Sequence, residues 1–266
     1  MHVISLGAGV QSTTMLLMAA RGEIEPKPRY AIFADTGWEP KAVYRHLDWL
    51  KGEAARYGIE IITVSKGNLR DDLIEACEHG TRFASIPFYT INPDGSPGMV
   101  RRQCTKEYKI EVIQRKCREL LGYKPRQRIP EGALTQWIGI SLDEYQRMRT
   151  SRDKWIVLRY PLIEKEMTRA DCLAWLERHG YPRPPKSSCI GCPFHNNRYW
   201  LEMKRNNPDE WAEAVEIDRK IRKIPRFRGQ AFLHAQRVPL DQVDLGEDQM
   251  DLFDGFINEC EGMCGV

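Results

Sequence analysis

The sequence predicts an α/β fold built on a doubly wound, mostly parallel sheet. Short apolar runs alternate with stretches of helical spacing over the first 65 residues, and a glycine-rich turn follows the first of these runs. A strand–helix–strand alternation at these lengths is typical of βαβ units. Right-handed crossovers then place helices on both faces of the sheet, so the expected fold is Rossmann-like.

The amino-terminal elements follow one another closely. We expect strands at His2–Leu6, Arg29–Ala34 and Glu60–Val64, and helices at Ser12–Arg21 and Pro40–Tyr57. In parallel sheets of this kind, ligands bind beyond the carboxyl ends of the strands. The segments Ser5–Gln11 and Asp35–Gly37 both lie there.

The later elements are less regular. Prolines and glycines indicate a loop over the site at Phe83–Gly98. We expect a basic amphipathic helix at Lys106–Leu121, a strand at Gln136–Ile140, a helix at Thr168–His179 with Thr168 as its N-cap, and one or two polar helices at Asn197–Lys223. These elements indicate a nucleotide-binding α/β domain over residues 1–165. A small helical, cysteine-bearing subdomain with a tail is expected over residues 166–266.

Length and composition fit this architecture. The 266 residues include 8 cysteines and carry a formal net charge of +3. We find no secretory signal and no run of about 18 apolar residues, so we expect a cytoplasmic protein with no membrane partner. Disulfides are rare in that compartment, so clustered cysteines indicate metal or redox chemistry. The clustered basic residues fit either phosphate groups or a solvated face.

The turn after the first strand has the composition of a phosphate-binding loop. It reads Ser5-Leu6-Gly7-Ala8-Gly9-Val10-Gln11-Ser12-Thr13. Glycines let backbone amides approach an anion, and the helix that follows directs its first N–H groups and its positive dipole end to the same place. The loop is neither a Walker A motif, which ends in Gly-Lys-Ser/Thr, nor a dinucleotide fingerprint, because Ser12 occupies the third glycine position. A purely structural glycine turn is the alternative.

This loop resembles the PP-loop of the N-type ATP pyrophosphatases, whose pattern is close to S-G-G-x-D-S. Gly9 and Ser12 match that pattern, while Gly7 stands in place of its first serine and Gln11 in place of its aspartate. Other segments resemble the branch that contains the phosphoadenylyl-sulfate (PAPS) reductases and the ATP-pyrophosphatase-like proteins of DNA phosphorothioation. These segments are Phe33–Gly37, Arg101–Lys109 and Trp137–Arg147, so the resemblance covers roughly residues 1–200.

The resemblance implies an adenine nucleotide alpha hydrolase-like fold that binds ATP or PAPS at the loop. The binding residues it implies are Ser5, Gly7, Ala8, Gly9, Gln11, Ser12, Thr13, Asp35, Thr36, Gly139 and Arg147. Asp35, at a strand end, is expected to act in catalysis by orienting Mg²⁺ or a nucleotide hydroxyl, and its alternative role is the N-cap of the next helix. The basic residues expected either to neutralise phosphate or sulfate oxygens or to form a solvated helix face are Arg101, Arg102, Lys106 and Lys109.

A C-x-x-C motif, Cys189-Ile190-Gly191-Cys192, lies in a tight loop near the end of the matched region. Such a loop directs two thiolates at one centre, as zinc and iron–sulfur sites require. By the resemblance, Cys104 joins Cys189 and Cys192 as ligands of one [4Fe–4S] cluster. Gln103 replaces the first of two adjacent cysteines in the family's pattern. The fourth ligand is therefore missing, supplied from elsewhere or left open.

The tail carries two more thiols, Cys260 and Cys264. The segment Glu259–Gly265 resembles the C-terminal Glu-Cys-Gly segment of sulfonucleotide reductases, whose cysteine attacks sulfur. Three roles follow. Cys260 acts as a catalytic or sulfur-carrying thiol, one tail cysteine completes the metal site, or both tail cysteines join the C-x-x-C pair in a zinc site that excludes Cys104.

Other chemically active side chains have structural interpretations. Three cysteines lie in apolar helical settings where buried structural cysteines are common: Cys77, Cys117 and Cys172. Trp200 and Trp211 have the spacing of core residues, with base stacking as the alternative. His195, just after the C-x-x-C motif, is either a donor or ligand at the metal site or a packing residue.

These features predict an ATP-dependent sulfur-transfer enzyme. An acceptor oxygen attacks the α-phosphorus, pyrophosphate leaves, and sulfur then displaces AMP with iron–sulfur assistance. The expected acceptor is a nucleic acid or nucleobase, because the cysteine pattern is shortened and basic residues lie near Arg147. A sulfur donor protein and a homodimer are expected partners. One alternative is a sulfonucleotide reductase, in which Cys260 attacks the sulfonyl group of PAPS or APS and sulfite is released. The other is a non-catalytic, zinc-stabilised nucleic-acid-binding subunit.

Overall fold

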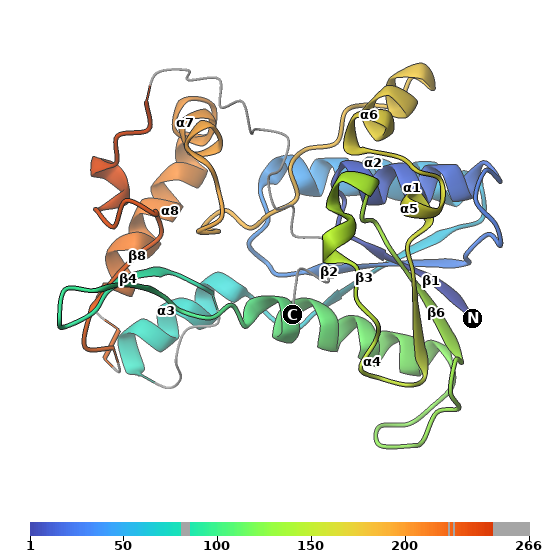
Figure 1. Cartoon of the computed structure of the whole chain (residues 1–266), viewed down its shortest axis with the longest axis horizontal. Coiled ribbons are helices and arrows are strands. Elements are labelled where there is room, and N and C mark those ends of the chain that lie inside the picture. Colours follow the sequence, from blue (N-terminus) through green and yellow to red (C-terminus); the bar gives the residue numbers. More distant parts are fainter. Residues whose placement is uncertain (81–85, 223, 226, 247–266) are drawn as a thin grey trace.

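The computed structural model describes residues 1–80, 86–222, 224–225 and 227–246. One half of it is built on a five-stranded parallel sheet (Figure 1). The strands are β1 (His2–Leu6), β2 (Tyr30–Asp35), β3 (Glu60–Ser65), β6 (Leu134–Ile138) and β7 (Ile156–Arg159), in the order β3-β2-β1-β6-β7. With helices packed against it, this sheet confirms the predicted α/β class.

The strand order reverses at β1, the middle strand. From β1 the chain moves outward to β2 and β3, and it later returns to the other side of β1 to form β6 and β7. Ser5 is paired in register with Ile32 of β2 and Ile138 of β6. The reversal makes the carboxyl ends of β1 and β6 a topological switch point, which is where open α/β sheets form the crevice that binds their ligands.

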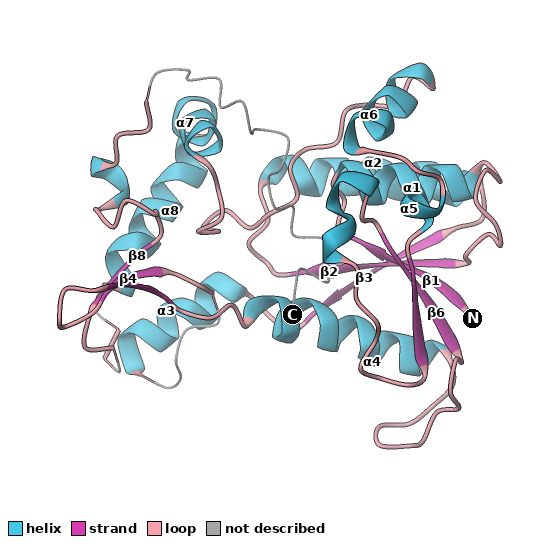
Figure 2. Cartoon of the chain, in the orientation of Figure 1, coloured by secondary structure: helices cyan, strands magenta, loops and turns pink. Residues whose placement is uncertain are grey.

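Helices cover both faces of this sheet (Figure 2). One face carries α1 (Val10–Ala20) and α2 (Lys41–Arg56), with α5 (Pro161–Glu164) and α6 (Arg169–Arg178) beside α1, and the other carries α4 (Glu111–Leu120). All eleven residues of α1 are buried, because α6 covers the side that the sheet leaves open. The capping box that begins α6, with Thr168 as its N-cap, confirms that part of the sequence prediction.

A second hydrophobic core lies beside the sheet. It contains α3 (Leu69–His79), α7 (Asn197–Asn206), α8 (Pro208–Ile221) and a small antiparallel sheet of β4 (Tyr89–Ile91), β5 (Pro97–Met99) and β8 (Gln230–Phe232). Trp38, from the loop after β2, is buried in this core and so joins it to the parallel sheet. Three short helical segments complete the described chain: η1 (Thr105–Ile110), η2 (Leu142–Arg147) and η3 (Leu240–Gln242).

Three sequence expectations were wrong in detail. The described part of the expected loop, residues 86–98, contains β4 and most of β5, and Pro97 is tolerated because β5 is an edge strand. The expected basic helix is divided into η1, which has π-helical hydrogen bonding, and α4. The strand predicted at Gln136–Ile140 begins and ends two residues earlier, as β6.

The division of the chain at residue 165 remains a prediction. The packing adds that Cys172, Trp175 and Leu176 of α6 lie in one hydrophobic cluster with α1, and that α3 packs against α8. None of the helices formed by the described residues combines the length and apolarity that a bilayer crossing requires.

Candidate functional site

The loop between β1 and α1 is held in an unusual backbone conformation. Ala8 has a φ of +59°, in the left-handed region, and its side chain is fully buried. The Gly7 N–H donates to Ser12 Oγ at 3.2 Å, which draws the loop back onto the first turn of the helix. Gly9, the N-cap, provides no side-chain cap, and the first turn contains no acidic residue. A left-handed non-glycine residue is costly, and such strain often marks functional sites.

Polar atoms around this loop are buried without hydrogen-bond partners. Within the part of the chain that the structure describes, Ser5 Oγ, Gln11 Oε1 and Glu39 Oε2 have none. Their residues are 1–3% exposed. A buried acceptor without a partner costs on the order of 1–3 kcal/mol. Three such groups at the carboxyl ends of β1 and β2 therefore indicate a site for a polar ligand.

Gln11 connects the two sides of the switch point. Its Nε2 donates to Ser141 Oγ at 3.4 Å and to Glu144 Oε2 at 3.2 Å, and both partners follow β6. Arg147 forms an ion pair with Glu144. The predicted residues Gln11 and Arg147 are thus linked through a carboxylate, Glu144, that the sequence motifs did not assign to the site. Gly139 lies in the same connection, directly after β6.

Asp35, the last residue of β2, does not cap the next helix. Its Oδ1 accepts hydrogen bonds from the Gly37 N–H and from Tyr44 Oη, each at 2.8 Å. The N-cap of α2 is Pro40, so the alternative role considered for Asp35 is wrong. Burial, together with the Asp35 carboxylate, raises the pKa of Tyr44, so this hydroxyl stays a donor. Asp35 Oδ2 makes no hydrogen bond with a described residue, and Asp35 is partly exposed.

A cluster of four side chains, of which three are buried and Cys189 is partly exposed, lies next to Asp35. Glu39 Oε1 accepts from Thr36 Oγ1 at 3.2 Å, forms an ion pair with Lys109 Nζ at 3.5 Å, and lies 3.7 Å from Cys189 Sγ. Thr36 Oγ1 is also 3.3 Å from Cys189 Sγ. The Lys109 and Glu39 side chains are only 7% and 1% exposed. Lys109 therefore does not lie on a solvated helix face. Glu39 carries no motif, so only its position two residues after Gly37 could have drawn attention to it.

The segment that carries the C-x-x-C motif is joined to the phosphate loop. Ser187 Oγ donates a hydrogen bond to the carbonyl oxygen of Gly7. Two residues later Cys189 enters the cluster around Glu39, and the Ile190 N–H donates to the Trp38 carbonyl at 3.0 Å. The C-x-x-C loop thus lies against the loops after both β1 and β2.

His195 holds the C-x-x-C loop in shape. Its Nε2 is 2.9 Å from the carbonyl oxygen of Cys189 and 3.2 Å from that of Ile190, so Nε2 carries the proton and donates to both. The ring stacks on Tyr199 with centroids 4.1 Å apart. Burial, with a contribution from Lys186, lowers the pKa of His195 well below its usual value, so the ring is neutral. His195 is a positioning residue for the two cysteines.

A second buried histidine supports the first turn of α1. His46 Nε2 is 3.1 Å from Thr13 Oγ1, so this hydroxyl of the predicted phosphate loop is engaged from within the fold. Burial lowers the pKa of His46 to about 4. The imidazole is therefore neutral at physiological pH, and it packs against Trp49 with ring centroids 5.3 Å apart.

The predicted metal ligands Cys104, Cys189 and Cys192 come from segments that approach one another. Cys104 and Cys189 pack against the same hydrophobic cluster, and Arg102 lies over the Phe194 ring at 5.2 Å. Among the described residues, however, no three His, Cys, Asp or Glu side chains form a group that could hold a metal ion. Cys260 and Cys264 lie outside the described residues. The [4Fe–4S] cluster therefore stays a prediction.

The structural interpretations of the other cysteines and of Trp200 are confirmed. Cys77 is 7% exposed and Cys117 and Cys172 are fully buried, and burial raises the pKa of Cys77 to about 11 and of Cys117 to about 12. Trp200 is fully buried, and Trp211 packs at the edge of the same core.

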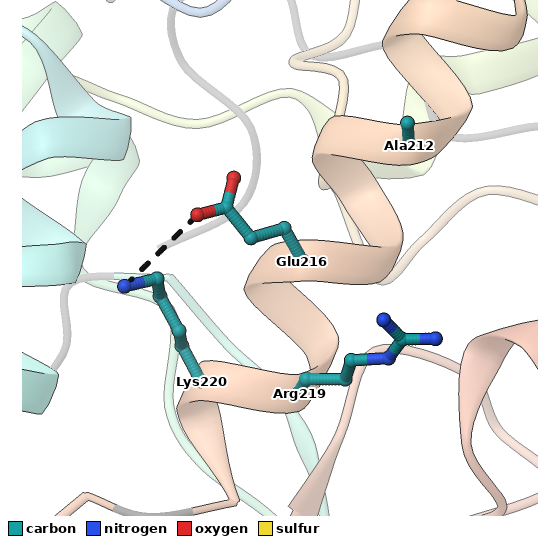
Figure 3. Close-up of a pocket in the computed structure, with 4 residues that line it drawn as sticks. All are labelled: Ala212, Glu216, Arg219 and Lys220. Atoms are coloured by element: carbon teal, nitrogen blue, oxygen red, sulfur yellow. Dashed lines mark ion pairs between the residues drawn. The ribbon is translucent and has the colours of Figure 1, made fainter.

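A pocket lies on α8, in the second hydrophobic core (Figure 3). It is lined by Ala212, Glu216, Arg219 and Lys220. The Lys220 ammonium is 2.6 Å from Glu78 and 4.0 Å from Glu216, and Arg219 is 2.6 Å from Asp241. Because these charges are matched within the protein, we assign no ligand to this pocket.

The parallel sheet and the reversal of its strand order at β1 define the chain as a Rossmann-like α/β protein. No protein-family model matches the chain, and no curated protein matches it in sequence. Among solved structures, it is similar to the PAPS reductase from Candida auris in its phosphate complex, with 18% sequence identity and a TM-score of 0.41. That match covers 69% of this chain and 74% of the reductase.

Proposed function

We propose that the chain is an enzyme that binds ATP at the β1–α1 loop and transfers sulfur to a nucleic acid or nucleobase. The observation that carries the proposal is the hydrogen bond from Ser187 Oγ to the Gly7 carbonyl. Cys189 follows two residues later, so its Cα lies within about 7 Å of the Ser187 Cα. A nucleotide at the loop and the Cys189 thiol would therefore occupy one crevice.

Features of the loop support the nucleotide. The N-cap Gly9 and the acid-free first turn of α1 leave the positive end of the helix dipole to an anion. Gln11 Oε1, buried without a partner among the described residues, is a polar atom that a bound ligand would satisfy. Asp35 Oδ2, at the neighbouring strand end, is the carboxylate oxygen best placed to take Mg²⁺ or a nucleotide hydroxyl.

The proposed reaction has two steps. An acceptor oxygen forms a bond to the α-phosphorus and pyrophosphate leaves with the electron pair of the broken P–O bond. A sulfur nucleophile from a donor protein then attacks the activated acceptor carbon, and AMP leaves with its oxygen. The chain contributes positioning and backbone N–H groups that stabilise charge on the phosphates. Thr36 and Glu39 hold Cys189 beside the crevice.

Neither step is routed through an iron–sulfur cluster, because the described residues alone do not assemble a group of ligands for a metal. The absorption spectrum and metal content of anaerobically purified protein test the predicted [4Fe–4S] cluster and the zinc alternative directly. A brown protein absorbing at roughly 400 nm supports the cluster.

The test of the proposed function is nucleotide turnover. Anaerobically purified protein is expected to bind ATP in calorimetry and to release pyrophosphate when an acceptor nucleic acid is added. Gln11→Leu removes the buried amide from the crevice and is expected to weaken ATP binding by about three- to tenfold, the value of one hydrogen bond. Gln114→Leu, on α4 at the opposite face of the sheet, removes the same group as a control. A flat ATP titration, or equal loss in both variants, contradicts the proposal.

A sulfonucleotide reductase is the alternative, because an anion site next to a thiol also suits a sulfated nucleotide. The same preparation is incubated with PAPS and a thiol reductant, and sulfite is measured. Sulfite release without pyrophosphate release from ATP would replace the sulfur-transfer proposal with the reductase.

A further inference from the structure

We propose that the exposed surface of residues 142–154 binds single-stranded nucleic acid, with a base stacked on Tyr145. This inference rests on the proposed function, because it assigns a place to the acceptor. The surface consists of η2 and the turn that leads to β7. Its central residue is Tyr145, whose side chain is 64% exposed and makes no ring contact or side-chain hydrogen bond with a described residue.

Packing does not account for the exposed ring. Hydrogen bonds to its backbone fix the segment to the rest of the fold. The Leu142 N–H donates to the Met167 carbonyl at 2.8 Å, and Tyr160 Oη accepts from the Arg149 N–H and donates to the Arg149 carbonyl. Met148 is also exposed, at 40%, and lies three residues after Tyr145. An aromatic ring on a fixed backbone, with an apolar side chain beside it, is the kind of platform on which unpaired bases stack.

The charges on this surface fit a phosphate backbone. Arg149, Arg152 and Lys154 are exposed and form no ion pair with any residue that the structure describes. The Arg149 guanidinium instead donates to the carbonyls of Gln146 and Met148. The three acidic residues of the segment are engaged by groups of the fold itself: Asp143 by the Arg169 N–H, Glu144 by Gln11 and Arg147, and Asp153 by Gln114. These three acidic residues are only partly exposed, whereas Arg149, Arg152 and Lys154 are exposed, so positive charge predominates on the outer surface.

The position of this surface links it to the nucleotide crevice. Ser141 and Glu144 contact Gln11 of the predicted phosphate loop. Tyr145 follows Ser141 by four residues, across a kink at Glu144, so the two Cα atoms lie within about 14 Å of each other. A nucleotide next to the base on Tyr145 would thus reach the crevice, which a distant basic surface would not allow.

The test uses fluorescein-labelled 12-nucleotide single strands of DNA and of RNA, and the DNA duplex, in anisotropy titrations of the full chain without ATP. Tyr145→Ala is expected to weaken single-strand binding by roughly tenfold, in line with the loss of one stacked base. Tyr145→Phe keeps the ring and is expected to restore binding. Arg149→Gln with Arg152→Gln is expected to reduce the salt slope by about 1.4, or about 0.7 for each phosphate that is no longer neutralised.

A matched control removes the same charge elsewhere. Arg115→Gln with Arg128→Gln affects exposed arginines on α4 and in the loop before β6, and is expected to leave binding unchanged. Any of four results overturns the proposed binding surface. These are equal weakening by both arginine pairs, tighter binding of duplex than of single strands, no binding of any strand, and wild-type affinity in Tyr145→Ala. Pyrophosphate release is measured separately. Its absence with intact Tyr145-dependent binding removes the proposed function and leaves the surface, and the reverse result removes only the surface.

Discussion

Gly191 lies so close to Trp38 that a Cβ atom built on it would be 2.1 Å from Cη2 of the indole. The indole cannot easily give way. Trp38 is 2% exposed, its indole Nε1 donates to Glu213 at 3.3 Å, and its backbone carbonyl accepts from the Ile190 N–H. The glycine in the C-x-x-C motif is therefore required by the approach of the loop to the second core.

Gly191→Ala is expected to destabilise the protein. The added methyl must push the cysteine loop away from Trp38, and overpacking of this kind costs about 1–3 kcal/mol. Gly52→Ala is the matched control, because Gly52 lies inside α2 with nothing within 4 Å of its added Cβ. It is expected to stabilise by about 0.5–1 kcal/mol through helix propensity. Urea denaturation of both variants measures whether their free energies of unfolding change in opposite directions. Equal changes would contradict a close approach of Gly191 to the indole.

The buried ion pair between Glu39 and Lys109 gives a second prediction. Lys109→Met leaves the Glu39 carboxylate buried without its cation, and breaking one side of such a pair typically costs about 3–5 kcal/mol. Combining Lys109→Met with Glu39→Leu is expected to recover most of the loss, because no buried charge remains. Lys106→Met, whose side chain is 75% exposed, serves as the control. If Lys109→Met were as stable as this control, the ion pair would not contribute to folding stability.

Much of the parallel sheet could be predicted because its strands are contiguous apolar runs. β1 matches its expected bounds, and β2 and β3 differ from theirs by one residue at most. β7 was missed because an edge strand of four residues, with Val157 half exposed, has no such run. The helix α3 was also missed, although the sequence marks both of its ends. The Asn68 side chain caps it by accepting from two backbone N–H groups, and Gly80 ends it in the left-handed conformation.

The site was predictable only where it depends on local sequence. The loop at Gly7 could be located from its composition, since glycines before a helix let backbone amides approach an anion. Glu39 and Ser187 could not, because their roles come from contacts across 70 or more positions with Lys109 and Gly7. Tertiary packing decides which of several similar residues is buried, and no periodicity records that choice.

Ser187 provides a prediction about the coupling between the two loops. Ser187→Ala removes the hydrogen bond to the Gly7 carbonyl and is expected to weaken ATP binding by about three- to tenfold. Ser188→Ala removes the neighbouring buried hydroxyl, which faces His195 at 3.5 Å and not the phosphate loop. Calorimetry on both variants separates a specific effect from general loss of packing. Unchanged affinity in Ser187→Ala would remove the link between the cysteine loop and the nucleotide.

The buried histidines predict that stability falls in mild acid. Burial lowers the pKa of His46 from 6.5 to about 4, so between these pH values the unfolded chain binds a proton that the folded chain does not. Stability contributed by the neutral ring is complete above pH 6.5 and is lost as the pH falls toward 4. The loss from this group is on the order of 3 kcal/mol. His195 and His234 have pKa values lowered by burial and act in the same direction.

His46→Gln keeps a hydrogen-bonding side chain beside Thr13 but removes the titration. Its free energy of unfolding, measured in urea between pH 7 and 5, is therefore expected to fall less steeply than that of the unmodified protein. Thr13→Val removes the partner at 3.1 Å and leaves the imidazole buried, so its pH dependence is expected to stay steep. The range above pH 5 is chosen because most carboxylates remain ionised there and contribute little to the slope. Equal slopes for His46→Gln and the unmodified protein would mean that His46 is protonated in the fold.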